Sequence, residues 1–129
     1  MRSAELIALE LSVILFIAHI MTQALLARAE FGQKYMMGAR DERRTVKGVL
    51  AGRAERALTN YIENYVPFVA LDLGLIATGR TGGFGALVWI AGRIAYLPVY
   101  LLGIPVARFI CWLVGIVGLL SMLARLAGA

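Results

Sequence analysis

Four long apolar segments dominate this chain of 129 residues. They cover residues 6–27, 51–78, 84–102 and 104–127. Each is long enough to cross the hydrocarbon core of a bilayer as a helix, since roughly 20 helical residues span a core about 30 Å thick. Turn-rich breaks at residues 78–85 and 103–105 separate the last three segments. The pattern predicts an all-α integral membrane protein, folded as a single bundle of four transmembrane helices.

Composition supports a membrane location for a chain of this length. Hydrophobic residues make up 60% of the sequence and the mean hydropathy is +0.78, which is too apolar for a small soluble domain. The formal net charge is +5, but no nucleic-acid motif accompanies it, so we expect no nucleic-acid partner. The single cysteine, Cys111, excludes an internal disulfide and a cysteine-rich metal site. We interpret it as an inert thiol that faces lipid or another helix.

The densest group of charges lies in a loop between the first two apolar segments, residues 28–48. Its basic residues are Arg28, Lys34, Arg40, Arg43, Arg44 and Lys47, against Glu30, Asp41 and Glu42. The positive-inside rule predicts that this loop is cytoplasmic, which in a bacterial inner membrane makes both termini periplasmic. We interpret the loop as a topogenic segment that contacts membrane lipids. A direct role in a ligand site, for example through Arg28 or Asp41, is the alternative.

The second apolar segment is the least hydrophobic and carries a polar stripe. The stripe consists of Arg53, Arg56, Asn60 and Glu63. On a helix with 100° per residue these positions fall within an arc of about 80°, whereas Glu55 lies about 200° from Arg53 and off the stripe. The third segment repeats the spacing with Arg93, Tyr96, Tyr100 and Gly103. Two stripes that face each other predict a polar cleft between these helices.

Such a cleft matches a ligand that carries carboxylates and an ammonium group. Arginine binds carboxylates through paired hydrogen bonds, glutamate accepts an amino group, and asparagine and tyrosine add further polar contacts. The same residues also fit ion pairs that set the register of the helices, or a path for protons or ions. No metal site is expected, because His19 has no second histidine or chelating carboxylate at a suitable spacing. We interpret His19 as a residue that hydrogen-bonds between helices.

The stretch RAERALTNYIENYVPF, residues 53–68, resembles the signature of the MAPEG family, the membrane-associated proteins in eicosanoid and glutathione metabolism. That signature holds an arginine, an asparagine four residues on, a glutamate three further, and a proline soon after. The matching residues here are Arg56, Asn60, Glu63 and Pro67, preceded by Arg53. The third segment, GRIAYLPVYLLGIPVAR, is similar to the family's arginine, aromatic, tyrosine pattern. The resemblance extends over nearly the whole chain, as one domain of residues 1–129, and is greatest to the short bacterial branch.

This resemblance implies a homotrimer of four-helix bundles, with glutathione bound as co-substrate in clefts between subunits. It assigns glutathione binding to Arg53, Arg56, Asn60, Glu63, Arg93, Tyr96 and Tyr100. A trimer is also favoured by the polar second segment, which needs neighbouring helices in a membrane. The implied activity is a transferase, with peroxidase activity as an addition, that joins the glutathione thiolate to a lipophilic electrophile. The alternative is a non-catalytic accessory protein that binds lipids or small molecules.

The resemblance also implies a catalytic arginine near the start of the fourth helix, for which Arg108 is the candidate. A nearby cation favours the thiolate form of a thiol, which is the nucleophile. Arg108 follows Tyr100 by eight residues, where the family's enzymes have seven or nine, and Gly103 and Pro105 interrupt the helix between them. One residue of slip on an unbroken helix turns a side chain by about 100°. An arginine that anchors the short loop at the interface is therefore the alternative. Tyr100 is the second catalytic candidate, since its hydroxyl can donate to a thiolate.

Overall fold

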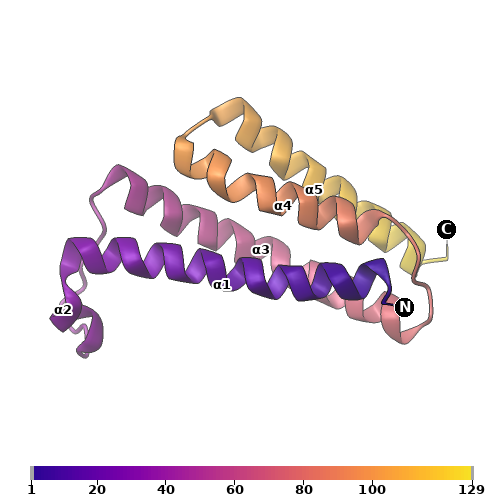
Figure 1. Cartoon of the computed structure of the whole chain (residues 1–129), viewed down its shortest axis with the longest axis horizontal. Coiled ribbons are helices and arrows are strands. Elements are labelled where there is room, and N and C mark those ends of the chain that lie inside the picture. Colours follow the sequence, from indigo (N-terminus) through magenta and orange to yellow (C-terminus); the bar gives the residue numbers. More distant parts are fainter. Residues whose placement is uncertain (1, 129) are drawn as a thin grey trace.

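The computed structural model describes residues 2–128 and is all-helical within that range. Its four long helices are α1 (Ala4–Phe31), α3 (Val49–Ala77), α4 (Gly85–Leu102) and α5 (Pro105–Leu126). Helix α1 packs mainly against α3, and α4 mainly against α5 (Figure 1). Both ends of the chain lie at one end of the bundle, and the short helix α2 (Gln33–Met37) lies at the other. The predicted all-α architecture is confirmed.

Local sequence signals determine where the helices begin and end. The side-chain oxygen of Ser3 caps α1 by accepting a hydrogen bond from the backbone N–H of Leu6 at 3.2 Å. Helix α1 stops at Gly32, whose φ of 89° is strained for residues other than glycine. Pro105 begins α5, where the missing N–H of proline leaves no helical hydrogen bond unmade.

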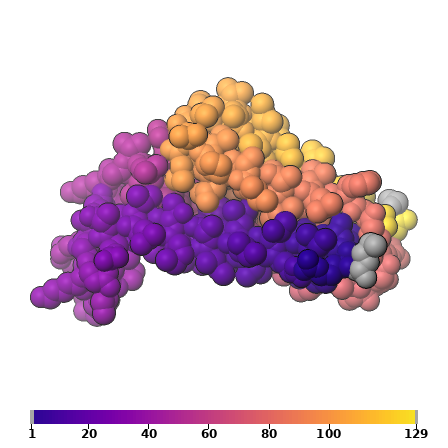
Figure 2. All heavy atoms as spheres, viewed as in Figure 1, coloured from indigo at the N-terminus to yellow at the C-terminus, as the bar shows by residue number. Residues whose placement is uncertain are grey.

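The segment predicted as a loop, residues 28–48, is partly helical. Helix α1 continues to Phe31, and α2 adds a short helix directly after Gly32. The difference arises because hydropathy marks only the apolar part of a helix. Backbone hydrogen bonding continues through polar residues such as Arg28 and Glu30, which are good helix formers. Figure 2 shows that the region around α2 projects from one end of the molecule.

Three helices, α1, α4 and α5, are long and apolar enough to cross a membrane, so the chain is an integral membrane protein. The 28 residues of α1 span about 42 Å at 1.5 Å per residue. Helix α3 is of similar length, but its charged residues make it more polar: Arg53, Glu55, Arg56, Glu63 and Asp72. It packs against α1, α4 and α5. This position shields much of a helix that would be poorly tolerated alone in lipid.

An aromatic core holds α3 and α4 in register. Phe68 and Trp89 are fully buried and stack with their ring centroids 3.8 Å apart. The contact between α4 and α5 is equally close, because a Cβ atom at Gly118 would lie 2.7 Å from the backbone nitrogen of Trp89. Small residues permit this approach of two helices in a membrane. The core thereby fixes the relative positions of the two helices that carry the polar stripes.

Candidate functional site

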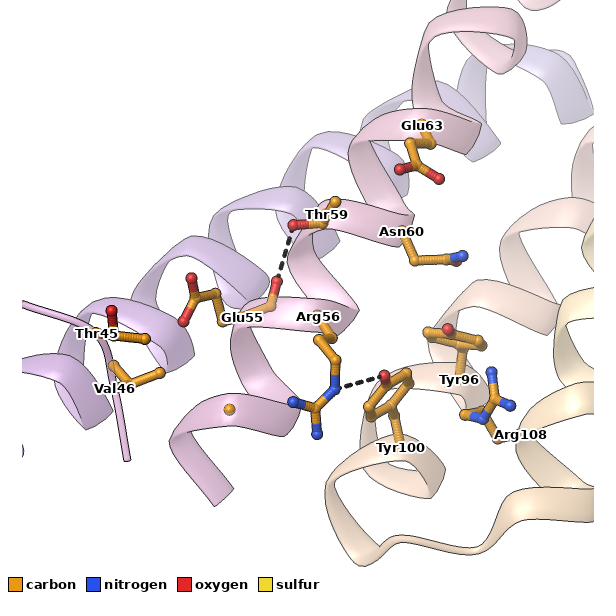
Figure 3. A pocket seen from close by; sticks show the side chains of 11 residues that line it. Thr45, Val46, Glu55, Arg56, Thr59, Asn60, Glu63, Tyr96, Tyr100 and Arg108 are labelled. Carbon is orange, nitrogen blue, oxygen red and sulfur yellow. Dashed lines mark hydrogen bonds between the residues drawn. The ribbon is translucent and has the colours of Figure 1, made fainter. Parts of the chain in front are cut away.

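A cavity of about 480 Å³ opens between α3, the end of α4 and the start of α5 (Figure 3). Its lining residues are Thr45, Val46, Gly52, Glu55, Arg56, Thr59, Asn60, Glu63, Tyr96, Tyr100 and Arg108. The volume lies within the range typical of small-molecule sites, about 300–1,000 Å³. The cavity is at the end of the bundle that holds α2 and the turn between α4 and α5, opposite the termini (Figure 1).

Six of the predicted site residues line this cavity: Arg56, Asn60, Glu63, Tyr96, Tyr100 and Arg108. Arg56 Nε donates to the hydroxyl oxygen of Tyr100 at 3.2 Å, which links α3 to α4. The guanidinium carbon of Arg108 lies 5.5 Å from the centroid of the Tyr100 ring. Tyr100 therefore lies between two cations that come from different helices (Figure 3). The hydroxyl of Tyr96 is buried and makes no hydrogen bond within residues 2–128, although Arg108 lies beside it.

Arg108 reaches the cavity because the chain reverses direction just before it. Helix α4 ends at Leu102, Gly103 takes a left-handed conformation with φ of 72°, and α5 begins at Pro105. Arg108 and Tyr100 thus belong to two different helices. The rotation of 100° per residue along one continuous helix does not apply between them. The spacing of eight residues is therefore compatible with a position in the cavity.

Two predicted site residues, Arg53 and Arg93, lie outside the cavity lining. Arg53 Nη1 donates to the backbone oxygen of Leu101 at 3.1 Å, which satisfies a free carbonyl at the end of α4. Its guanidinium also packs against Gly103, where a Cβ atom would lie only 2.6 Å away. Arg93 is fully buried, and its Nη1 donates to Oδ1 of Asn60 at 2.7 Å. It lies behind a residue that does line the cavity.

The charged residues of the cavity have no ion-pair partner in the described chain. Residues 2–128 contain two ion pairs, Arg2–Glu10 and Arg44–Glu42, and neither lies at the cavity. Arg56 and Glu63 are exposed and Arg108 is half-buried. Unpaired charges of both signs beside apolar helices favour a ligand that carries anionic and cationic groups.

The segment before α3 forms part of the cavity wall because Glu30 holds it in place. The carboxylate of Glu30 accepts hydrogen bonds from the backbone N–H groups of Lys47 at 2.8 Å and Gly48 at 2.7 Å. A carboxylate at this position also satisfies free N–H groups at the start of a helix. The neighbouring residues Thr45 and Val46 are thereby brought to the cavity.

Helical spacing missed two further lining residues, Glu55 and Thr59. The Glu55 side chain points toward the segment before α3 and away from Arg56, so the cavity extends round the helix (Figure 3). A helical wheel shows the direction of a side chain but not the loop that folds against it, so the sequence contained no signal for this wall. Arg28 and Asp41, the loop residues predicted as alternative ligand contacts, do not line the cavity.

Comparison with known proteins agrees with the resemblance found in residues 53–68. The family description that matches is the MAPEG family, over residues 8–128. The match includes all of α3, α4 and α5 and every residue that lines the cavity. No curated protein and no solved structure matches the sequence. The chain therefore belongs to the MAPEG family, the membrane-associated proteins in eicosanoid and glutathione metabolism.

Proposed function

We propose that the protein is a membrane-bound glutathione transferase that acts on lipophilic electrophiles. The observation that carries this proposal is the meeting of Arg56, Tyr100 and Arg108 at one cavity. Glutathione offers two carboxylates, an ammonium group and a thiol. Arg56 suits a carboxylate, and Glu63 suits the ammonium group. Family membership supports glutathione as the ligand.

Arg108 and Tyr100 are the residues that we assign to the thiolate. A positive charge and a hydroxyl donor near the sulfur favour the thiolate, which is the reactive form. In the transfer, the thiol proton passes to solvent, a C–S bond forms, and the leaving group departs with its bonding electrons. As a peroxidase, the protein would oxidise two glutathione molecules to their disulfide while a hydroperoxide is reduced to an alcohol and water.

We further propose that three copies of the chain assemble and that the cavity is completed at the boundary between subunits. Arg56 and Glu63 are exposed on a face of α3 that also carries Val66, which is 69% exposed. Unpaired charges on an apolar face are costly in a bilayer unless protein covers them. A neighbouring subunit would cover this face and exclude water from the thiolate. A detergent-corrected mass of three chains supports this assembly, and a stable monomer contradicts it.

We propose that the cavity opens toward the cytoplasm of a bacterial cell. The basic segment 28–48 lies at the same end of the bundle as the cavity (Figure 1), and the positive-inside rule makes that end cytoplasmic. The termini would then be periplasmic. A cysteine introduced as Arg43→Cys should react with an impermeant reagent only in inverted inner-membrane vesicles. Equal labelling in intact spheroplasts would contradict this orientation.

Binding and turnover, measured separately on the purified protein in detergent, test the proposed function. Glutathione binding is measured by calorimetry, and turnover as conjugation of a chloronitrobenzene with release of chloride. We expect Arg56→Ala to weaken binding by about 10- to 100-fold, and Arg108→Ala to bind but to lose turnover. Arg43→Ala is the matched control, since this exposed arginine lies outside the cavity.

The results of these assays separate the two candidate functions. An absence of binding at millimolar glutathione contradicts the proposed transferase function. Binding without turnover in the unmodified protein favours instead a non-catalytic protein that binds lipids or small molecules.

A further inference from the structure

Arg93 is a fully buried cation directly behind the cavity wall. Its guanidinium carbon lies 4.1 Å from the ring centroid of Tyr96 and 5.3 Å from that of Tyr61. No acidic residue pairs with it within residues 2–128. Burying a charge without a counter-ion is costly, and the faces of aromatic rings offset part of that cost. These rings also hold the guanidinium in a defined position.

The one hydrogen bond that the Arg93 side chain makes within residues 2–128 fixes the orientation of the Asn60 amide. Arg93 Nη1 donates to Oδ1 of Asn60 at 2.7 Å. Arginine has donors only, so the amide oxygen is the atom that must face it. The opposite orientation would place two N–H donors against each other. The Nδ2 group of Asn60 is therefore turned away from Arg93, and the side chain points into the cavity (Figure 3).

We propose that Arg93 is a positioning residue, which holds the Asn60 amide with its NH₂ group directed at the bound ligand. The inference rests on the proposed function, because the ligand is taken to be glutathione. The ligand atom at Asn60 is then a hydrogen-bond acceptor, such as a carbonyl or carboxylate oxygen, and an ammonium group is rejected there. Glu63, about one helical turn further along α3, is left to receive the ammonium group.

A double-mutant cycle on glutathione affinity separates positioning from direct contact. We expect Arg93→Met and Asn60→Leu each to weaken binding by about tenfold, the scale of one lost hydrogen bond. If Arg93 acts through Asn60, the double variant binds no more weakly than Asn60→Leu alone, within about twofold. Arg56→Ala combined with Arg93→Met is the matched control. These two losses should multiply, because Arg56 and Arg93 share no hydrogen-bond partner within residues 2–128.

Conservative variants supply readouts that do not depend on loss of the side chain. Arg93→Lys keeps a charged donor and should bind glutathione more tightly than Arg93→Met. Asn60→Asp places a carboxylate against Arg93, so the midpoint of thermal unfolding should rise. The same substitution in an Arg93→Met background should give no such rise. Asn60→Asp should also weaken glutathione binding, because the donor toward the ligand is replaced by a negative charge.

Each outcome decides the inference. Losses that multiply for Arg93→Met and Asn60→Leu overturn it, because they show two independent contributions to binding. A thermal midpoint for Asn60→Asp that is equally raised with and without Arg93 also overturns it. If the unmodified protein binds no glutathione, the proposed function fails. The Asn60→Asp comparison then decides by itself whether Arg93 holds the side chain at position 60.

Discussion

The two ends of the bundle use charged side chains in different ways. At the end that holds the termini, the buried carboxylate of Glu5 accepts the backbone N–H groups of Gly82 at 3.0 Å and Gly83 at 3.2 Å. Arg125 Nε donates to the backbone oxygen of Arg80 at 2.7 Å. These charges tie the loop between α3 and α4 to α1 and α5. Here the charged groups stabilise the fold.

At the other end, by contrast, the charged side chains that line the cavity lack partners of opposite sign within residues 2–128. Arg56 donates to the hydroxyl of Tyr100, and Glu63 and Arg108 form no ion pair within residues 2–128. Charged groups whose hydrogen bonds are taken up by the backbone have little capacity left for a ligand. Those at the cavity retain that capacity. The comparison therefore predicts that substitutions of the charged residues that line the cavity change function, and that substitutions of the charged residues at the other end change stability.

The largest effect is expected for Arg108→Ala. Turnover should fall by about 100-fold or more, the scale of losing one stabilising group for a developing or bound anion. Glutathione affinity should change by a few-fold only, because the variant keeps Arg56, the residue proposed to bind a carboxylate. Steady-state conjugation rates together with calorimetry check both parts. Unchanged turnover would show that Arg108 only anchors the turn between α4 and α5.

A smaller effect is expected for Arg56→Ala, and it concerns binding. Loss of a charge-assisted hydrogen bond should weaken glutathione affinity by about 10- to 100-fold. The midpoint of thermal unfolding should change little, because the one hydrogen bond that the Arg56 side chain makes within residues 2–128 is with the Tyr100 hydroxyl. A large drop in that midpoint with unchanged affinity would show that Arg56 stabilises the fold and does not bind the ligand.

Glu5→Leu tests the opposite end of the bundle. The substitution leaves the N–H groups of Gly82 and Gly83 without their acceptor, which should lower the free energy of unfolding by about 1–3 kcal/mol. Thermal unfolding in detergent measures the effect. Glutathione affinity of the folded protein should be unchanged. A weaker affinity would mean that the two ends are coupled and that the division of roles is wrong.

The smallest effect is expected for Arg43→Ala. This side chain is exposed and makes no hydrogen bond within residues 2–128, so affinity and turnover should stay within about twofold of the unmodified protein. A strong loss of glutathione binding would show that the cavity extends further into segment 28–48 than its lining residues indicate.

Helical spacing predicted five of the eleven residues that line the cavity. Arg56, Asn60 and Glu63 share one face of α3, and Tyr96 and Tyr100 share one face of α4, so their meeting follows from two helices in contact. The same reasoning predicted that Arg53 and Arg93 line the cavity, which they do not. A helical wheel shows only the direction of a side chain around its own helix axis, and not what the neighbouring helix places against it. Arg53 instead donates a hydrogen bond to the backbone carbonyl of Leu101, and Arg93 donates one to the side chain of Asn60.

The sequence was enough to identify an all-helical membrane chain of the MAPEG family. The features that did so are the lengths of the apolar segments, the polar stripe and the signature of residues 53–68. These features are local, since they depend on hydropathy and on the period of one helix. The division of the charged residues between fold and cavity depends on neighbours that are distant in the sequence. Arg108 lines the cavity because the chain reverses direction at Gly103. Thr45 lines it because the Glu30 carboxylate binds the backbone of the segment before α3. No period within a single helix encodes such contacts, because each joins two separate elements.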